Sequence, residues 1–96
     1  MTTEQRGAMR VGTDLSADVR RGGTARIPGT VTDMSITGFR VSSHEKLPLG
    51  GTVWVRIDPL APLMAQVIWS QQYVAGCTFA SPLHPAVFDH LVATGE

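Results

Sequence analysis

Apolar and polar residues alternate along most of the chain between Asp14 and Ala80. This period of two is typical of β-strands that bury one face and expose the other. Segments rich in turn residues interrupt the alternation, namely RRGG, TDMSITG, SSHEKLPLGG and DPLAP, and divide it into about six short strands. The positions expected to face the core are Leu15, Ala17, Val19, Ala25, Ile27, Val31, Phe39, Val41, Val53, Val55, Ile57, Ala65, Val67, Trp69, Val74 or Tyr73, and Phe79.

The pattern changes after the last expected strand. Ser81-Pro82 resembles the start of a helix, and Leu83, Val87, Phe88, Leu91 and Val92 then follow at near-helical spacing. About six short strands are too many for a flat sheet in so small a chain, because the edge strands would stay exposed. The sequence therefore predicts a mainly all-β fold, an antiparallel barrel of six strands with a short C-terminal α-helix.

Composition narrows the class of ligand. The 96 residues suit a single domain, and 43% hydrophobic with 17% charged residues is typical of a folded soluble protein. The net charge of zero disfavours binding to long nucleic acid, which usually needs an excess of basic residues. Seven of the eight basic residues are arginine, the side chain suited to phosphates and bases, although a GC-rich genome would give the same bias.

Signals for an enzyme or a metal site are weak. His44, His84 and His90 do not have the spacing that places two ligands on one helical face, so neither a metal site nor any catalytic residue is expected. Cys77 is the single cysteine, and its position inside an expected strand favours a buried apolar role over a nucleophile. The first residues do not resemble a signal peptide, and no run approaches the length of a membrane span, so we expect a cytoplasmic protein.

Two motifs stand out from this background. Arg6 and Arg10 form R-x-x-x-R just before the first expected strand, and Asp33, Ser35 and Gly38 form D-x-S-x-x-G. The second motif is the more specific, since this composition gives only about 0.03 matches by chance. Its alternative interpretation is a plain turn between strands, because Asp and Ser bond nearby backbone groups and Gly allows positive φ.

The two motifs together resemble the PilZ domain family. The similarity extends to AQVIWS and GCTF, which resemble the A-x-V-x-W and G-x-x-F strands of that domain and are structural rather than binding marks. The resemblance implies a six-stranded barrel of PilZ type with a terminal helix, serving as a receptor for the bacterial second messenger cyclic di-GMP. A receptor of this kind needs no cofactor, and the resemblance implies no enzymatic activity.

Roles for the motif residues follow from the resemblance. Arg6 and Arg10 would clamp phosphate and guanine, since a guanidinium binds either in bidentate fashion. Asp33 would accept hydrogen bonds from a guanine edge, and Ser35 would bond a base or a phosphate. Gly38 would hold the turn and leave room for the ligand.

The chain is expected to divide into a flexible N-terminal segment, residues 1–13, that carries the R-x-x-x-R motif, and the barrel with its helix, residues 14–96. Ligand would order the first segment and so change a surface that an unidentified effector protein recognises.

Two other functions compete with the receptor. One is a PilZ-like protein-protein interaction module that binds no nucleotide, with Trp54 as the anchor if its side chain is exposed and not buried under the helix or another strand. The other is a small nucleic-acid-binding barrel that uses Arg20, Arg21 and Arg26, which the zero net charge and the few aromatic residues disfavour.

Overall fold

The structure is a computed structural model that describes residues 9–22 and 26–94. It contains six strands and one helix in these residues: β1 (Val11–Arg20), β2 (Ile27–Met34), β3 (Gly38–Ser43), β4 (Thr52–Arg56), β5 (Leu63–Gln71), β6 (Val74–Phe79) and α2 (Pro85–Thr94). Because β1 begins at Val11, residues 11–13 are part of the barrel. Residues 1–8 of the segment 1–13 that was expected to be flexible lie outside the described residues.

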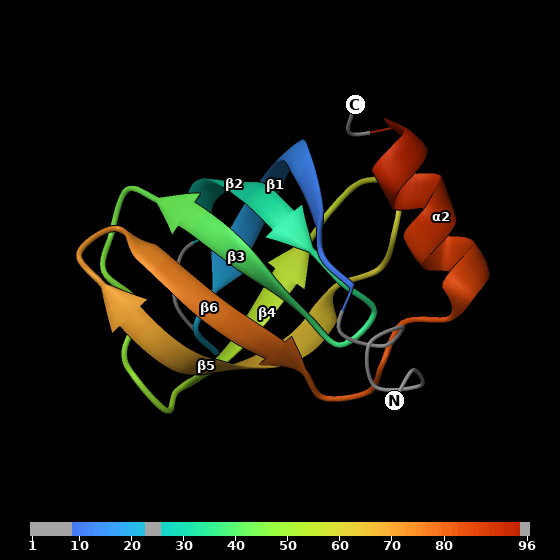
Figure 1. Ribbon diagram of the computed structural model, residues 1–96. Coiled ribbons are helices and arrows are strands. Elements are labelled where there is room, and N and C mark those ends of the chain that lie inside the picture. Colours follow the sequence, from blue (N-terminus) through green and yellow to red (C-terminus); the bar gives the residue numbers. More distant parts are fainter. Residues whose placement is uncertain (1–8, 23–25, 95–96) are drawn as a thin grey trace.

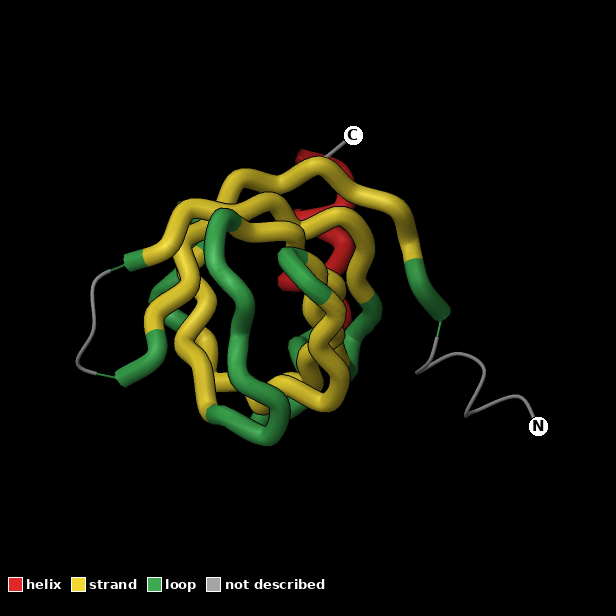
Figure 2. Tube along the Cα trace, turned by 90° about the vertical axis from the view of Figure 1, so that its left-hand side faces the viewer, coloured by secondary structure: helices red, strands yellow, loops and turns green. Residues whose placement is uncertain are grey.

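The strands form a closed antiparallel barrel in the order β1-β2-β3-β6-β5-β4, and pairing between β1 and β4 completes the ring. Figure 1 shows α2 at one end of the barrel, beside the start of β1, and Figure 2 shows the ring of strands closed around the core. The predicted fold class is thus confirmed. Full closure leaves every strand with two hydrogen-bonded neighbours, so no edge of the sheet is exposed.

Most positions expected to face the core do so. The buried apolar side chains come from all six strands, the loops after β3 and β4, the segment before α2 and α2 itself: Leu15, Ala17, Val19, Ile27, Val31, Met34, Phe39, Val41, Leu47, Val53, Val55, Ile57, Ala65, Val67, Ala75, Cys77, Phe79, Leu83 and Leu91. Phe39 and Phe79 pack with ring centroids 5.0 Å apart. Ala25 lies outside the described residues.

Two of the expected core positions are wrong. Trp69 is 38% exposed because a bulge between Val67 and Trp69 breaks the alternation and turns the indole outward. Tyr73 is also exposed and Val74 is only partly buried, since the inward positions of β6 are Ala75, Cys77 and Phe79.

The helix begins later than its sequence signal. Pro85 is its first residue, not Ser81-Pro82, and the preceding His84 accepts a hydrogen bond from the Ala86 amide through Nδ1 (3.0 Å). Proline suits the first helical position because its missing N–H would be unpaired there anyway. No helix of the described residues is long and apolar enough to cross a membrane.

Candidate functional site

A bulge in β2 brings Asp33 to the outer face of the barrel. In the β2–β3 register, Val31 pairs with Val41 and Asp33 pairs with Arg40, so Thr32 is an extra residue on β2. Val31 and Met34 are both fully buried, and two consecutive residues between them therefore turn away from the core. A bulge of this kind re-aims a side chain without ending the strand.

The neighbouring strand β1 is irregular at the same level. Its register with β2 shifts between Gly12 and Leu15, and the Thr13 hydroxyl donates to the Val31 carbonyl at 2.7 Å. On the other side, the Thr32 hydroxyl donates a longer hydrogen bond to the Arg40 carbonyl at 3.4 Å. Side-chain hydroxyls thus supply bonds where the regular ladder is interrupted, which holds the two bulges in place.

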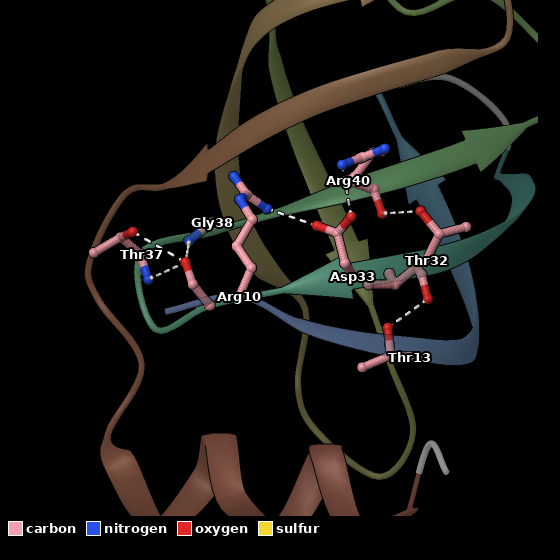
Figure 3. A network of polar contacts seen from close by, with 9 residues as sticks. Arg10, Thr13, Thr32, Asp33, Thr37, Gly38 and Arg40 are labelled. Atoms are coloured by element: carbon pink, nitrogen blue, oxygen red, sulfur yellow. Dashed lines mark hydrogen bonds and ion pairs between the residues drawn. The ribbon is translucent and has the colours of Figure 1, made fainter. Parts of the chain in front are cut away.

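Two arginines meet the Asp33 carboxylate from opposite sides. Arg10 Nη1 lies 2.7 Å from Oδ1, and Arg40 Nη2 lies 2.9 Å from Oδ2, so each carboxylate oxygen has its own guanidinium. Figure 3 shows the two side chains reaching toward Asp33 across three adjacent strands. The arginine side chains remain 45% and 48% exposed, whereas that of Asp33 is 15% exposed. The carboxylate therefore holds two solvent-facing cations at fixed positions.

Ser35 builds the turn that follows Asp33. Its side chain is almost fully buried, at 2% exposure, and its oxygen accepts from the amides of Thr37 and Gly38, both at 3.2 Å. Its hydroxyl also shares a hydrogen bond with Thr37 Oγ1, 3.1 Å away. The Ser35 amide donates to the Gly38 carbonyl (2.8 Å) and closes the turn. The geometry thus supports the turn interpretation of this serine.

Gly38 is required by the neighbouring strand. Its backbone does not adopt the positive φ that a turn glycine can supply. Instead, a Cβ at this position would collide with the carbonyl oxygen of Cys77 on β6. The motif glycine therefore lets β3 start close against β6.

The D-x-S-x-x-G turn is also fastened to the C-terminal part of the chain. The Thr37 carbonyl accepts from the Phe79 amide (2.8 Å) and from the Thr78 hydroxyl (3.1 Å). The Ile36 carbonyl accepts from the Leu83 amide at 2.9 Å, just before α2. A displacement of the turn would thus act directly on the end of β6 and on the segment that leads into the helix.

Trp69 lies near the cluster on the same outer face. Arg40 pairs with Gly76 on β6, and Gly76 pairs with Trp69 on β5. The indole covers Gly76 so closely that a Cβ there would overlap the ring. The partly exposed aromatic ring is therefore separated from Arg40 by a residue without a side chain.

The structure brings together Arg10 and Asp33 and places Ser35 and Gly38 in the adjoining turn, whereas Arg6 lies outside the described residues. Arg40 was not predicted from the sequence. The alternation in the sequence placed Arg40 on the outer face, between the inward-facing Phe39 and Val41. Its pairing with Asp33, however, depends on the register of the β2–β3 pair, which the sequence does not reveal.

Other reactive groups of the described residues do not form a site. Burial raises the pKa of the Cys77 thiol from 9.0 to about 12, as expected for a core side chain. Within residues 9–22 and 26–94, no cluster of three His, Cys, Asp or Glu side chains could hold a metal ion.

These observations define a small closed barrel whose outer face carries two fixed arginines around a carboxylate, beside a rigid turn. Such an arrangement suits an anionic ligand that also offers hydrogen-bonding groups. The chain belongs to the PilZ domain family, whose model matches residues 4–94, nearly its whole length. PilZ domains are generally modules that bind cyclic di-GMP. A comparison with curated proteins found no match.

Proposed function

We propose that this protein is a receptor for cyclic di-GMP and that Arg10, Asp33 and Arg40 form the described part of its binding site. The observation that carries the proposal is the geometry around Asp33 on β2, where one carboxylate pairs with two half-exposed guanidinium groups, that of Arg10 just before β1 and that of Arg40 on β3. Fixed donors bind a ligand better than mobile ones, because less side-chain entropy is lost on binding.

The chemistry of the ligand fits this arrangement. Cyclic di-GMP has two phosphates and two guanines, and a guanidinium can bind either a phosphate or guanine O6 and N7 in bidentate fashion. Arg10 and Arg40 each direct one nitrogen at Asp33, so further N–H donors of each fork remain for the ligand. Each Asp33 oxygen likewise keeps acceptor capacity for the N1–H and N2–H donors of a guanine.

The remaining motif residues complete the proposed site. Arg6 would add a further cation to the clamp. Ser35 and Gly38 would act by shaping the turn and by fixing the path of the chain beside Asp33, since Ser35 is buried and Gly38 lies against β6. The exposed indole of Trp69 would offer a surface beside Arg40 on which a guanine ring stacks.

Signalling would use both ends of the chain. Ligand that binds Arg6 and Arg10 would order the N-terminal segment over the barrel, at the cost of its backbone entropy. The hydrogen bonds that the amides of Phe79 and Leu83 donate to the carbonyls of Thr37 and Ile36 would pass a movement of the turn toward α2. The changed surface would be recognised by an effector protein, in the cytoplasm where a nucleotide messenger acts.

Isothermal titration of the purified protein with cyclic di-GMP tests the proposal, with GMP as a control ligand. We expect saturable binding with a dissociation constant on the order of micromolar, which corresponds to about 8 kcal/mol. Arg10→Gln and Arg40→Gln should each weaken binding, whereas Arg20→Gln, the same change at the other end of β1, should not. Absence of binding by the folded wild type would favour an interaction module that does not bind nucleotide.

A further inference from the structure

A recess of about 390 Å³ lies on the outer face of β1 and β4, at the other end of β1 from the Asp33 cluster. Arg20 pairs with Trp54 and Asp18 pairs with Arg56 across these strands, and all four side chains line the recess. β1 is 10 residues long, so roughly 30 Å of extended strand separates Arg10 from this place. We call it the β1–β4 pocket.

The pocket has an apolar part. Trp54, which is partly exposed on the outer face, and the segment Pro59–Pro62 after β4 contribute it. Within that segment Leu60 also packs against the core, which fixes the loop at this point. A concave surface formed by an indole, two prolines and aliphatic groups is suited to an apolar side chain of a partner.

The rim of the pocket is basic. Arg20, Arg26 and Arg56 line it together with a single acidic residue, Asp18, which leaves two net positive charges. Arg56 lies 3.7 Å from Asp58, whereas Arg20 and Arg26 make no ion pair with any residue of 9–22 or 26–94. Two exposed guanidinium groups next to an apolar hollow match carboxylates that flank an apolar side chain.

A second hollow of about 230 Å³ adjoins the pocket along β1, since Asp18 and Arg56 line both. Two adjoining hollows along one strand favour an extended chain over a compact small molecule. The second hollow has Asp58 and Asp18 against Arg56, so it carries a net negative charge. A phosphate backbone carries a charge at every nucleotide and would be repelled there, whereas a peptide can confine its carboxylates to the part that meets Arg20 and Arg26 and place uncharged residues along the second hollow.

We infer that the β1–β4 pocket binds an acidic peptide segment of a partner protein, with an apolar side chain against Trp54 and carboxylates on Arg20 and Arg26. The inference rests on the proposed function in one respect, because a receptor must pass its signal to a partner protein. The pocket and the nucleotide site are separate, so each can be tested without the other.

Fluorescence anisotropy with the whole chain tests this inference. The probe is a labelled peptide with a Leu-Phe pair between a run of glutamate and a run of serine, and the control peptide has glutamine in place of glutamate. The double variant Arg20→Gln, Arg26→Gln should bind the acidic peptide at least about fivefold more weakly, and added NaCl should weaken wild-type binding. Lys46→Gln, Gln71→Glu lowers the net charge by the same amount at exposed positions elsewhere and should bind it as the wild type does.

The outcomes separate this inference from the receptor function. Loss of peptide binding in the pocket variant, with cyclic di-GMP binding intact, supports the inference. The same support follows if the peptide binds but the nucleotide does not, although the proposed function then fails. If cyclic di-GMP binds saturably but the peptide does not bind at ~1 mM, the inference is overturned and the proposed function stands. Tighter binding of oligothymidylate than of the peptide, lost in the pocket variant, would assign the pocket to nucleic acid and also overturn it.

Discussion

Asp33 faces Arg40 directly across β2 and β3, because the extra residue Thr32 turns the Asp33 side chain to the outer surface that Arg40 already occupies. Arg10, just before β1, approaches the other carboxylate oxygen. The spacing of the two guanidinium groups is therefore set by strand pairing and by a bulge, both of which belong to the rigid barrel. A site with this origin keeps its geometry when the ligand leaves.

Asp33→Asn should impair ligand binding far more than folding. Each ion pair involves a half-exposed arginine, and such pairs contribute about 0–1 kcal/mol, so the loss of stability should stay below about 2 kcal/mol. Without the carboxylate, Arg10 and Arg40 lose their common partner and repel each other. We expect at least about tenfold weaker binding of cyclic di-GMP, equivalent to ~1.4 kcal/mol.

Urea denaturation and isothermal titration of the same Asp33→Asn preparation measure the two effects. Asp14→Asn is the control, because Asp14 is exposed on β1 and makes no ion pair with the described residues. Wild-type affinity in a folded Asp33→Asn protein would contradict the proposed role of the carboxylate.

Ser35→Ala should destabilise the fold. The substitution removes the oxygen that accepts from the Thr37 and Gly38 amides, and Gly38 is buried, so its N–H cannot turn to water. An unsatisfied buried donor costs about 1–3 kcal/mol. Ser16→Ala on the exposed face of β1 should change the free energy of unfolding by less than about 0.5 kcal/mol. Equal unfolding midpoints in urea for the two variants would show that the Ser35 hydroxyl does not hold the turn.

The alternation of the sequence predicted the barrel because each strand buries one face, and that requirement is local to the strand. It failed at Trp69, where an extra residue on β5 shifts the pairing and reverses the direction of the side chain. A bulge depends on the partner strand, so the pattern of a single strand does not reveal it. The consecutive polar residues Thr32 and Asp33, between Val31 and Met34, are a local sign of the bulge that turns Asp33 to the outer face.

The motif residues show a similar limit. The sequence marked Asp33, Ser35 and Gly38 as a unit, and the structure places them in and beside a single turn. The role of Gly38, however, depends on Cys77, which is distant in sequence and approaches only after β6 has paired with β3. Arg40 was missed for the same reason, since its partner is defined by the register across a turn.

Gly38→Ala should therefore be costly even though the glycine has no unusual φ. The new methyl group would meet the backbone carbonyl of Cys77, which cannot move without shifting β6, and such overpacking typically costs about 1–3 kcal/mol. Gly12→Ala is the matched control, because a Cβ at Gly12 meets nothing within 4 Å. We expect thermal unfolding to show a lower midpoint for Gly38→Ala and little change for Gly12→Ala. Similar midpoints would mean that β6 adjusts to the methyl group.

Cys77 should be unreactive in the folded protein. Its side chain is buried between Phe39 and Val67 on the neighbouring strands, and desolvation raises the pKa of its thiol from 9.0 to about 12. The thiolate is the reactive form, so a thiol-specific disulfide reagent near neutral pH should label Cys77 only after unfolding. Rapid labelling of the native protein, at a rate independent of added denaturant, would contradict the burial of this residue.

The same pKa shift makes folding stability depend on pH. The folded state binds the thiol proton more tightly than the unfolded state, so this contribution is complete below pH 9.0 and is lost as the pH rises toward 12. The free energy of unfolding should therefore fall above pH 9.0 more steeply for the wild type than for Cys77→Ala, which has no thiol to titrate. Urea denaturation at several pH values measures the two slopes, and parallel curves would show that the thiol does not contribute to the alkaline loss of stability.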